Sequence, residues 1–166
     1  MTVQTTYRLD TEASELSFSA RAMFGTATVR GTFAVTGGEV TVEPDGGIRV
    51  AAVVAADSVD TGLAKRDEHI VSSDYLGARE HPEIRFSGSA PAGATAGRGV
   101  LRGELTVAGR TRPVDLDLGE VVADGRGAVA EAAVEIDRYE FGVTAGKGMT
   151  GRRITVRIRA VATPAA

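Results

Sequence analysis

The chain has 166 residues, no cysteine and a formal net charge of −3. This length is typical of one domain, so we predict a single domain over residues 1–166 that is large enough to bury a core. The lack of cysteine excludes disulfides, thiolate metal sites and a cysteine nucleophile, and the mild negative charge argues against nucleic acid as a partner.

The N-terminal residues show no basic stretch followed by an apolar run. No apolar segment approaches the ~18–20 residues that span a bilayer. We therefore expect a cytoplasmic protein without stable membrane insertion; the alternative is export, if a signal has been removed. A homodimer is compatible with the sequence, which does not determine the oligomeric state.

Alternation of apolar and polar residues dominates the chain and predicts antiparallel strands with one buried and one wet face. In residues 15–22, for example, Leu16, Phe18, Ala20 and Ala22 alternate with polar neighbours. The same period recurs further along the chain at 28–35, 50–54, 101–107, 114–118, 134–137 and 153–159. Glycine-rich or aspartate-rich turn signals lie at 36–38, 44–47, 108–110 and 124–127, and a loop is predicted at 91–99.

Residues 61–77 break this alternation and show helical spacing instead. The residues that recur with this spacing are Leu63, Arg66, Asp67, Ile70 and Val71. Asp60 or Thr61 is suited to cap the first turn, and Ser73 a second short turn that ends at Gly77. We therefore predict one or two short helices across one end of a barrel of some eight strands, since long one-sided strands favour a closed sheet without edges.

The size of the inward residues determines whether such a barrel is filled or hollow. The apolar face includes many small residues: Ala20, Ala22, Gly31, Ala52, Ala56, Gly88, Gly103 and Ala160. One interpretation is an internal cavity occupied by an apolar chain, because an unfilled core is costly. The other is that these residues lie at bends or close approaches, or reflect an alanine-rich composition. The pattern alone leaves both open.

Residues 57–86 carry the most specific motifs in the chain: Ser58-Val59-Asp60-Thr61-Gly62, Arg66-Asp67-x-His69-Ile70, Ser73-Asp74-Tyr75-Leu76 and His81-Pro82-x-Ile84-x-Phe86. Other matching segments are Tyr7-x-Leu9-Asp10, Ser14-x-Leu16-x-Phe18, Val29-x-Gly31-x-Phe33, Gly103-x-Leu105-Thr106-Val107-x-Gly109, Pro113-Val114 and Ile136-Asp137-Arg138-x-x-Phe141-Gly142. In these motifs the chain resembles the YceI-like family, lipocalin-like β-barrels that bind polyisoprenoids or related lipids. The family usually carries a histidine, and often a second one, where this chain has Ala13 and Ala22.

The resemblance implies an all-β fold: a single antiparallel eight-stranded lipocalin-like barrel with one or two short helices, at about 61–77, at one end. It implies the binding, carriage or sequestration of a long-chain apolar ligand without a cofactor or catalysis. The ligand class is a polyisoprenoid, such as a prenyl pyrophosphate or quinone, or a fatty-acid-like lipid. Two alternatives are an enzyme acting on an isoprenoid or acyl lipid and a ligand-free structural barrel with a filled core.

The predicted interior combines the inward strand positions with the segment across the barrel end. It comprises Leu16, Phe18, Ala20, Ala22, Gly31, Phe33, Ala52, Val54, Ile70, Leu76, Phe86, Gly103, Leu105, Leu116, Ile136, Phe141, Val156 and Ile158.

Few polar residues are candidates for chemistry. Arg138 continues the inward phase of its strand and, like Arg66, is a candidate for binding a ligand head group. The alternative for Arg138 is an ion pair with Asp67 or Asp57, and for Arg66 a structural brace. His69 and His81 are too few for a metal site, and we predict that His81 makes a structural hydrogen bond in its loop. No catalytic motif of known spacing is present.

Overall fold

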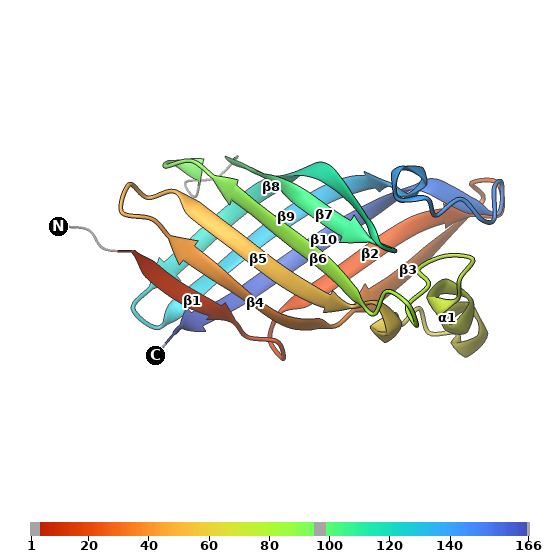
Figure 1. Ribbon diagram of the computed structural model, residues 1–166, viewed down its shortest axis with the longest axis horizontal. Coiled ribbons are helices and arrows are strands. Elements are labelled where there is room, and N and C mark those ends of the chain that lie inside the picture. The colour runs from red at the N-terminus through yellow and green to blue at the C-terminus, as the bar shows by residue number, and fades with distance from the viewer. Residues whose placement is uncertain (1–3, 95–98, 166) are drawn as a thin grey trace.

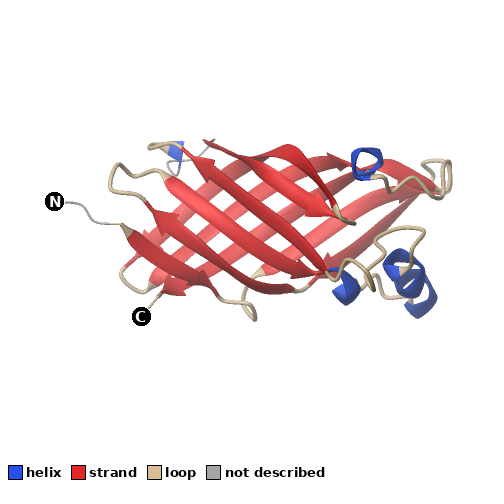
Figure 2. Cartoon of the chain, in the orientation of Figure 1, coloured by secondary structure: helices blue, strands red, loops and turns tan. Residues whose placement is uncertain are grey.

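The computed structural model describes residues 4–94 and 99–165. Ten strands make up most of this part of the chain (Figures 1 and 2). The strands are β1 (Thr5–Leu9), β2 (Glu15–Ala22), β3 (Ala27–Phe33), β4 (Val35–Val42), β5 (Ile48–Ala55), β6 (Glu83–Ala90), β7 (Gly99–Val107), β8 (Arg110–Asp124), β9 (Gly127–Asp137) and β10 (Thr150–Pro164). The helical elements are η1 (Ala56–Ser58), α1 (Ala64–Val71) and η3 (Arg138–Phe141).

The strands form one closed antiparallel sheet. β10 pairs with β9 along one edge, and along its other edge with β2 and then, nearer its C-terminus, with β1. β4 likewise pairs with β1, and β3 with β2. β1 and β2 therefore share one position in the ring and β3 and β4 the next, so the barrel is eight-stranded and the predicted fold is confirmed.

The two ends of the barrel are built from different elements (Figure 1). The helix end carries α1, η3, the β2–β3 turn at 23–26 and the β7–β8 turn at 108–109. The termini end carries the two chain ends together with the β4–β5 and β8–β9 connections. Because β10 has 15 residues, it spans roughly 35–40 Å along an axis to which strands tilt by roughly 35–45°.

The segment across the helix end contains one helix rather than two. The N-cap position of α1 is Leu63, which makes no side-chain cap, so the prediction of Asp60 or Thr61 as the cap is wrong. Instead, Asp67 in the first turn accepts hydrogen bonds from the backbone N–H (2.9 Å) and hydroxyl of Thr61. The residues after α1 form a hydrogen-bonded turn that closes at Gly77, where φ is +56°.

The turn predicted at 36–38 is also wrong, because these residues lie inside β4. Gly37 pairs with Val53 at a β-bulge, and the chain breaks earlier, at Ala34. A Cβ on Gly38 would lie 2.5 Å from Leu9 Cδ1, so glycine here permits close contact with β1. The turns predicted at 44–47, 108–110 and 124–127 are observed. Residues 95–98 of the loop predicted at 91–99 lie outside the described residues.

One cluster of buried residues lies away from the helices, although Ala56 in η1 and Phe141 in η3 are buried as well. The main buried cluster comprises Ile48, Ala90, Ala94, Leu101, Leu116 and Leu118. Ile48 and Ala90 lie at the strand ends that face the termini end. Within residues 4–94 and 99–165, no large side chain is less than 2% exposed. A barrel whose interior was filled to native density would bury several large side chains completely, so this interior contains space.

Candidate ligand-binding cavity

The barrel encloses a cavity of about 1210 Å³. This volume exceeds the roughly 300–1,000 Å³ typical of small-molecule sites. Residues from all ten strands line it, together with the α1 segment and the 138–149 segment, and most of these residues are aliphatic or aromatic. The cavity is therefore an elongated apolar chamber along the barrel.

Most of the predicted interior faces this chamber. The predicted residues that line it are Leu16, Phe18, Ala20, Ala22, Phe33, Ala52, Val54, Ile70, Leu76, Phe86, Leu105, Leu116, Ile136, Phe141, Val156 and Ile158. At the alanine positions the small side chains leave open volume rather than contacting a neighbouring backbone. The cavity interpretation therefore applies to Ala20, Ala22, Ala52 and Ala160. It is wrong for Ala56, which lies in η1, is 1% exposed and does not line the chamber.

The two predicted glycines, Gly31 and Gly103, do not line the chamber. A Cβ on Gly31 would lie 2.6 Å from the ring of Phe18, which covers this position from the paired strand. A Cβ on Gly103 would lie 2.0 Å from Ser87 O on β6. The alternative interpretation therefore applies to the glycines: an aromatic ring or a neighbouring backbone already occupies the space.

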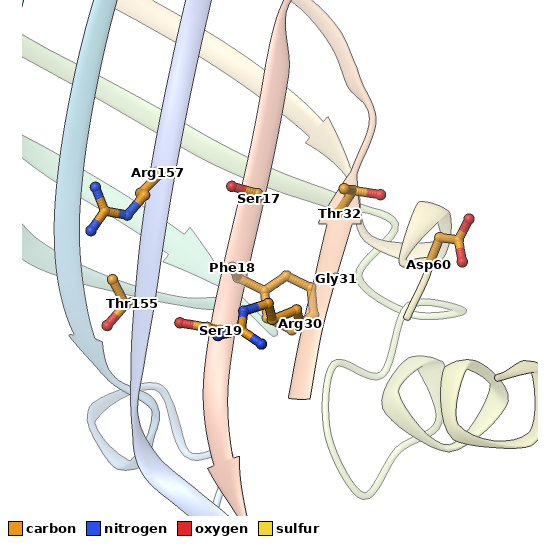
Figure 3. A pocket seen from close by; sticks show the side chains of 9 residues that line it. All are labelled: Ser17, Phe18, Ser19, Arg30, Gly31, Thr32, Asp60, Thr155 and Arg157. Atoms are coloured by element: carbon orange, nitrogen blue, oxygen red, sulfur yellow. The ribbon is translucent and has the colours of Figure 1, made fainter. Parts of the chain in front are cut away.

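Gly31 instead faces a separate hollow of about 460 Å³ on the outer surface of β2, β3 and β10. Figure 3 shows Gly31 beside Phe18, with the polar side chains of Ser17, Ser19, Arg30 and Arg157 around them. Phe18 and Gly31 both line this hollow. Its other lining groups belong to the ordinary polar outer face of the sheet.

Arg138 is the most buried charged side chain in the described part of the chain, with an exposed fraction of 5%. Its guanidinium donates to three backbone carbonyls: Nε to Gly151 O (2.8 Å), Nη1 to Val143 O (2.8 Å) and Nη2 to Thr150 O (2.9 Å). The alternative for Arg138, an ion pair with Asp67 or Asp57, is wrong, because none of the ion pairs within the described residues includes Arg138. Arg138 ties the 143–151 segment to η3 and also lines the cavity.

Asp137, the residue before Arg138, fixes the start of η3. Its carboxylate accepts a hydrogen bond from Tyr139 N (3.0 Å) and is paired with Arg152 (2.7 Å). The hydrogen bond from the Arg152 guanidinium lowers the pKa of the Asp137 carboxyl below its ordinary value. This charged pair on the outer face holds the segment from which Arg138 reaches inward.

The α1 segment closes the helix end from the other side. Ile70, Tyr75 and Leu76 line the cavity, and the Tyr75 hydroxyl lies 2.9 Å from the Thr150 hydroxyl at the start of β10. The Tyr75 ring lies 5.7 Å from the Arg138 guanidinium carbon. Met23 and Met149 line the same end and are about half exposed, which places an opening of the cavity there.

Arg66 acts as a brace within the α1 segment. Its Nε donates to Thr61 Oγ1 (2.8 Å) and its Nη2 to Thr61 O (2.8 Å), and the side chain also lines the cavity. His69 lines the cavity too, with Nε2 3.0 Å from Asp74 Oδ2. The hydrogen bond predicted for the His81 side chain is not formed among the described residues; its ring packs against Gly109 instead. No group of three or more metal-ligating side chains occurs within the described residues.

The sequence pattern missed several residues at the helix end. Arg21 lies in the polar phase of β2 and is exposed, as this phase predicts, but it also borders the cavity where β2 ends. Tyr75 and Thr150 were also missed as a pair, because their contact joins residues 75 positions apart. The only local sign of this contact in the sequence was the aromatic residue Tyr75 within the Ser73-Asp74-Tyr75-Leu76 motif.

The fold and the cavity define a class of protein: a closed antiparallel barrel with an elongated apolar interior. The sequence matches the YceI-like domain over residues 7–162, and the chain belongs to the YceI-like family. It is similar to Protein YceI of Escherichia coli O157:H7, with 26% identity over 160 residues that cover 92% of this chain and 83% of that protein.

Two solved structures share the fold. Burkholderia cenocepacia BcnA superimposes with a TM-score of 0.78 at 21% identity, covering 93% of this chain and 99% of that one. A polyisoprenoid binding domain from Saccharophagus degradans, implicated in plant cell wall breakdown, superimposes with a TM-score of 0.71 at 14% identity, covering 97% and 99%.

Proposed function

We propose that this protein binds and carries one long-chain lipid of the polyisoprenoid type inside its barrel. The observation that supports this most strongly is the apolar chamber of about 1210 Å³, combined with the lack of completely buried large side chains among the described residues. An empty apolar chamber of this size is a poor core, and a hydrocarbon chain would complete it. The solved neighbour described as a polyisoprenoid binding domain supports the same ligand class.

The energetics favour a long chain over a small molecule. Burial of hydrocarbon stabilises a complex by about 0.8 kcal/mol per methylene. Association costs about 4–15 kcal/mol, so roughly 20 buried carbons are needed before binding becomes tight. A chamber that follows strands of up to 15 residues offers the length for such a chain.

A carrier role is also consistent with the way the polar groups of the cavity are used. Arg138 donates to three carbonyls, Arg66 donates to Thr61, and Tyr75 contacts Thr150. Each of these contacts holds the helix end together, and none pairs a nucleophile with a general base. The proposed mechanism is encapsulation: the barrel hides the apolar chain from water until the chain leaves through the helix end.

Native mass spectrometry tests this function directly. The purified protein would be measured before and after extraction with organic solvent and then incubated with decaprenol, ubiquinone-10 or palmitic acid. We expect an added mass that extraction removes, and uptake of at least one long-chain probe at one molecule per barrel. A single mass equal to that of the bare polypeptide, with no uptake of any probe, would refute the proposal.

A further inference from the structure

The charged groups around the cavity are not evenly distributed. Its charged lining residues are Arg21, Arg66 and Arg138, and the titratable His69 lies with them. All four belong to the helix end: Arg21 at the end of β2, Arg66 and His69 on α1, and Arg138 in η3. Within residues 4–94 and 99–165, no Asp or Glu lines the cavity. The chamber therefore has one cationic end and a long uncharged remainder.

Arg138 is a buried cation whose hydrogen-bond partners are all neutral. A guanidinium has five N–H groups, and three of them bond to the carbonyls of Val143, Thr150 and Gly151, which leaves two. The rings of Tyr139 and Tyr75, 5.1 and 5.7 Å from the guanidinium carbon, add weak attraction. Buried charges are normally paired, because leaving water costs an ion several kcal/mol. An anion in the cavity would supply the missing partner.

The neighbouring groups suit such an anion. The hydroxyls of Tyr75 and Thr150 lie 2.9 Å apart and both line the chamber, so one of them is free to donate to an anion while accepting from the other. Arginine recognises carboxylate and phosphate oxygens with paired N–H groups. At the termini end, by contrast, the lining includes Val42, Ile48 and Leu118 and suits only the chain.

From this asymmetry we infer that the ligand is an anionic amphiphile, held with its carboxylate or phosphate head against Arg138 at the helix end and its chain toward the termini end. This inference rests on the proposed function and specifies the class and orientation of its ligand. A neutral lipid would leave the charge of Arg138 uncompensated. Arg66 and the exposed Arg21, which border the same end of the chamber, add to the positive potential that favours an anionic head.

Paired probes that differ only in their heads test the inference. Palmitate and hexadecanol share one chain, and farnesyl phosphate and farnesol share another. We expect the wild-type protein to bind each anion at least tenfold more tightly than its alcohol, as measured by displacement of a fluorescent fatty acid analogue. The relative size of the two preferences distinguishes a carboxylate from a phosphate head.

Variants then locate the head group. Arg138→Gln should reduce the preference for each anion over its matched alcohol to about twofold or less. Arg66→Gln should reduce the preference for anions only partially. Arg85→Gln is the matched control, because Arg85 is an exposed arginine on β6 that pairs with Glu83 and does not line the cavity. This control should keep the full preference.

A second measurement avoids dependence on the folding of Arg138→Gln. Palmitate labelled with ¹³C at its carboxyl, bound to the wild-type protein, should titrate at lower pH than palmitate in micelles, because a neighbouring guanidinium favours the carboxylate. Equal binding of anions and alcohols, with an unshifted carboxyl titration, would overturn the inference and leave the carrier function intact. Failure of all four probes and of the longer decaprenol to bind would instead count against the carrier function.

Discussion

Replacement of Ala52 by Phe separates a hollow barrel from a filled one. Ala52 lies on β5, pairs with Phe86 and lines the cavity. In a filled core, an added ring forces neighbouring side chains out of their rotamers and costs about 1–3 kcal/mol. At about 2–4 °C per kcal/mol for a chain of this size, that would lower the melting temperature by roughly 2–12 °C.

The structure predicts a different result, because the new ring would enter part of a 1210 Å³ space. Burying an aromatic side chain contributes about 1.5–3 kcal/mol relative to full exposure, so the unliganded Ala52→Phe variant should melt at the same or a higher temperature. The ring also fills part of the cavity beside the middle of β5. Uptake of decaprenol should therefore fall at least tenfold, whereas the much shorter farnesol should bind nearly as well as before.

Ala51→Phe is the matched control, because Ala51 is the neighbouring residue on the same strand and is exposed on the outer face. It should leave the uptake of both probes unchanged. Differential scanning fluorimetry and native mass spectrometry on the three delipidated proteins provide the measurements. If Ala52→Phe lowers the melting temperature by several degrees and Ala51→Phe does not, the interior is already packed, and the physical basis of lipid carriage is lost.

Three further predictions concern the framework of the site. Gly103→Ala should lower the melting temperature by several degrees, because the new Cβ would lie 2.0 Å from Ser87 O on β6. Gly37→Ala is the control and should not lower it, because no atom lies within 4 Å of the Cβ position at Gly37. Equal melting temperatures for the two variants would show that β6 and β7 can separate at no cost. Asp67→Ala should lower the melting temperature, because the Asp67 carboxylate accepts a hydrogen bond from Thr61. It should leave the affinity for hexadecanol within about twofold, because Asp67 does not line the cavity. An unchanged melting temperature with lost hexadecanol binding would place Asp67 in the ligand site. Since the Arg152 contact lowers the pKa of the Asp137 carboxyl in the folded state, its contribution to stability is complete above the unfolded pKa of about 3.9 and is lost as the pH falls through the folded value. The difference in melting temperature between the wild type and Asp137→Asn should thus be full at pH 6 and shrink below about pH 4, and a difference independent of pH would contradict this assignment.

Local patterns were sufficient for most of the fold. The alternation of Leu16, Phe18 and Ala20 with polar neighbours predicts β2 with its observed bounds, since strand pleating places successive side chains on opposite faces. The same period gives the inward phase of Ala52 and Val54 on β5. The motifs in residues 57–86 indicate the family, because so many residue types at fixed spacing are hard to match by chance.

Other features depend on neighbours that are distant in sequence. Gly37 and Gly38 read as a turn, but β1 and β5 on either side hold them in β4 as a bulge. Small residues looked alike in the sequence, yet Gly31 is covered by Phe18 on the paired strand, whereas Ala20 and Ala52 border open space. Strand pairing determines which small residue is covered by a large side chain from the next strand. The sequence of a single strand does not show which residues it pairs with.

The cationic end of the chamber also required the tertiary structure. The sequence placed Arg138 on the inward face but could not supply its partners, which come from residues 143–151 folding back over η3. Arg21 and Arg66, far apart along the chain, border the same chamber because β2 and α1 meet at one end of the barrel. Alternation along a strand determined that this protein is a barrel with an apolar interior. Closure of the sheet determined how much of that interior is empty and which end carries the charge, because both depend on contacts between strands and loops distant in sequence.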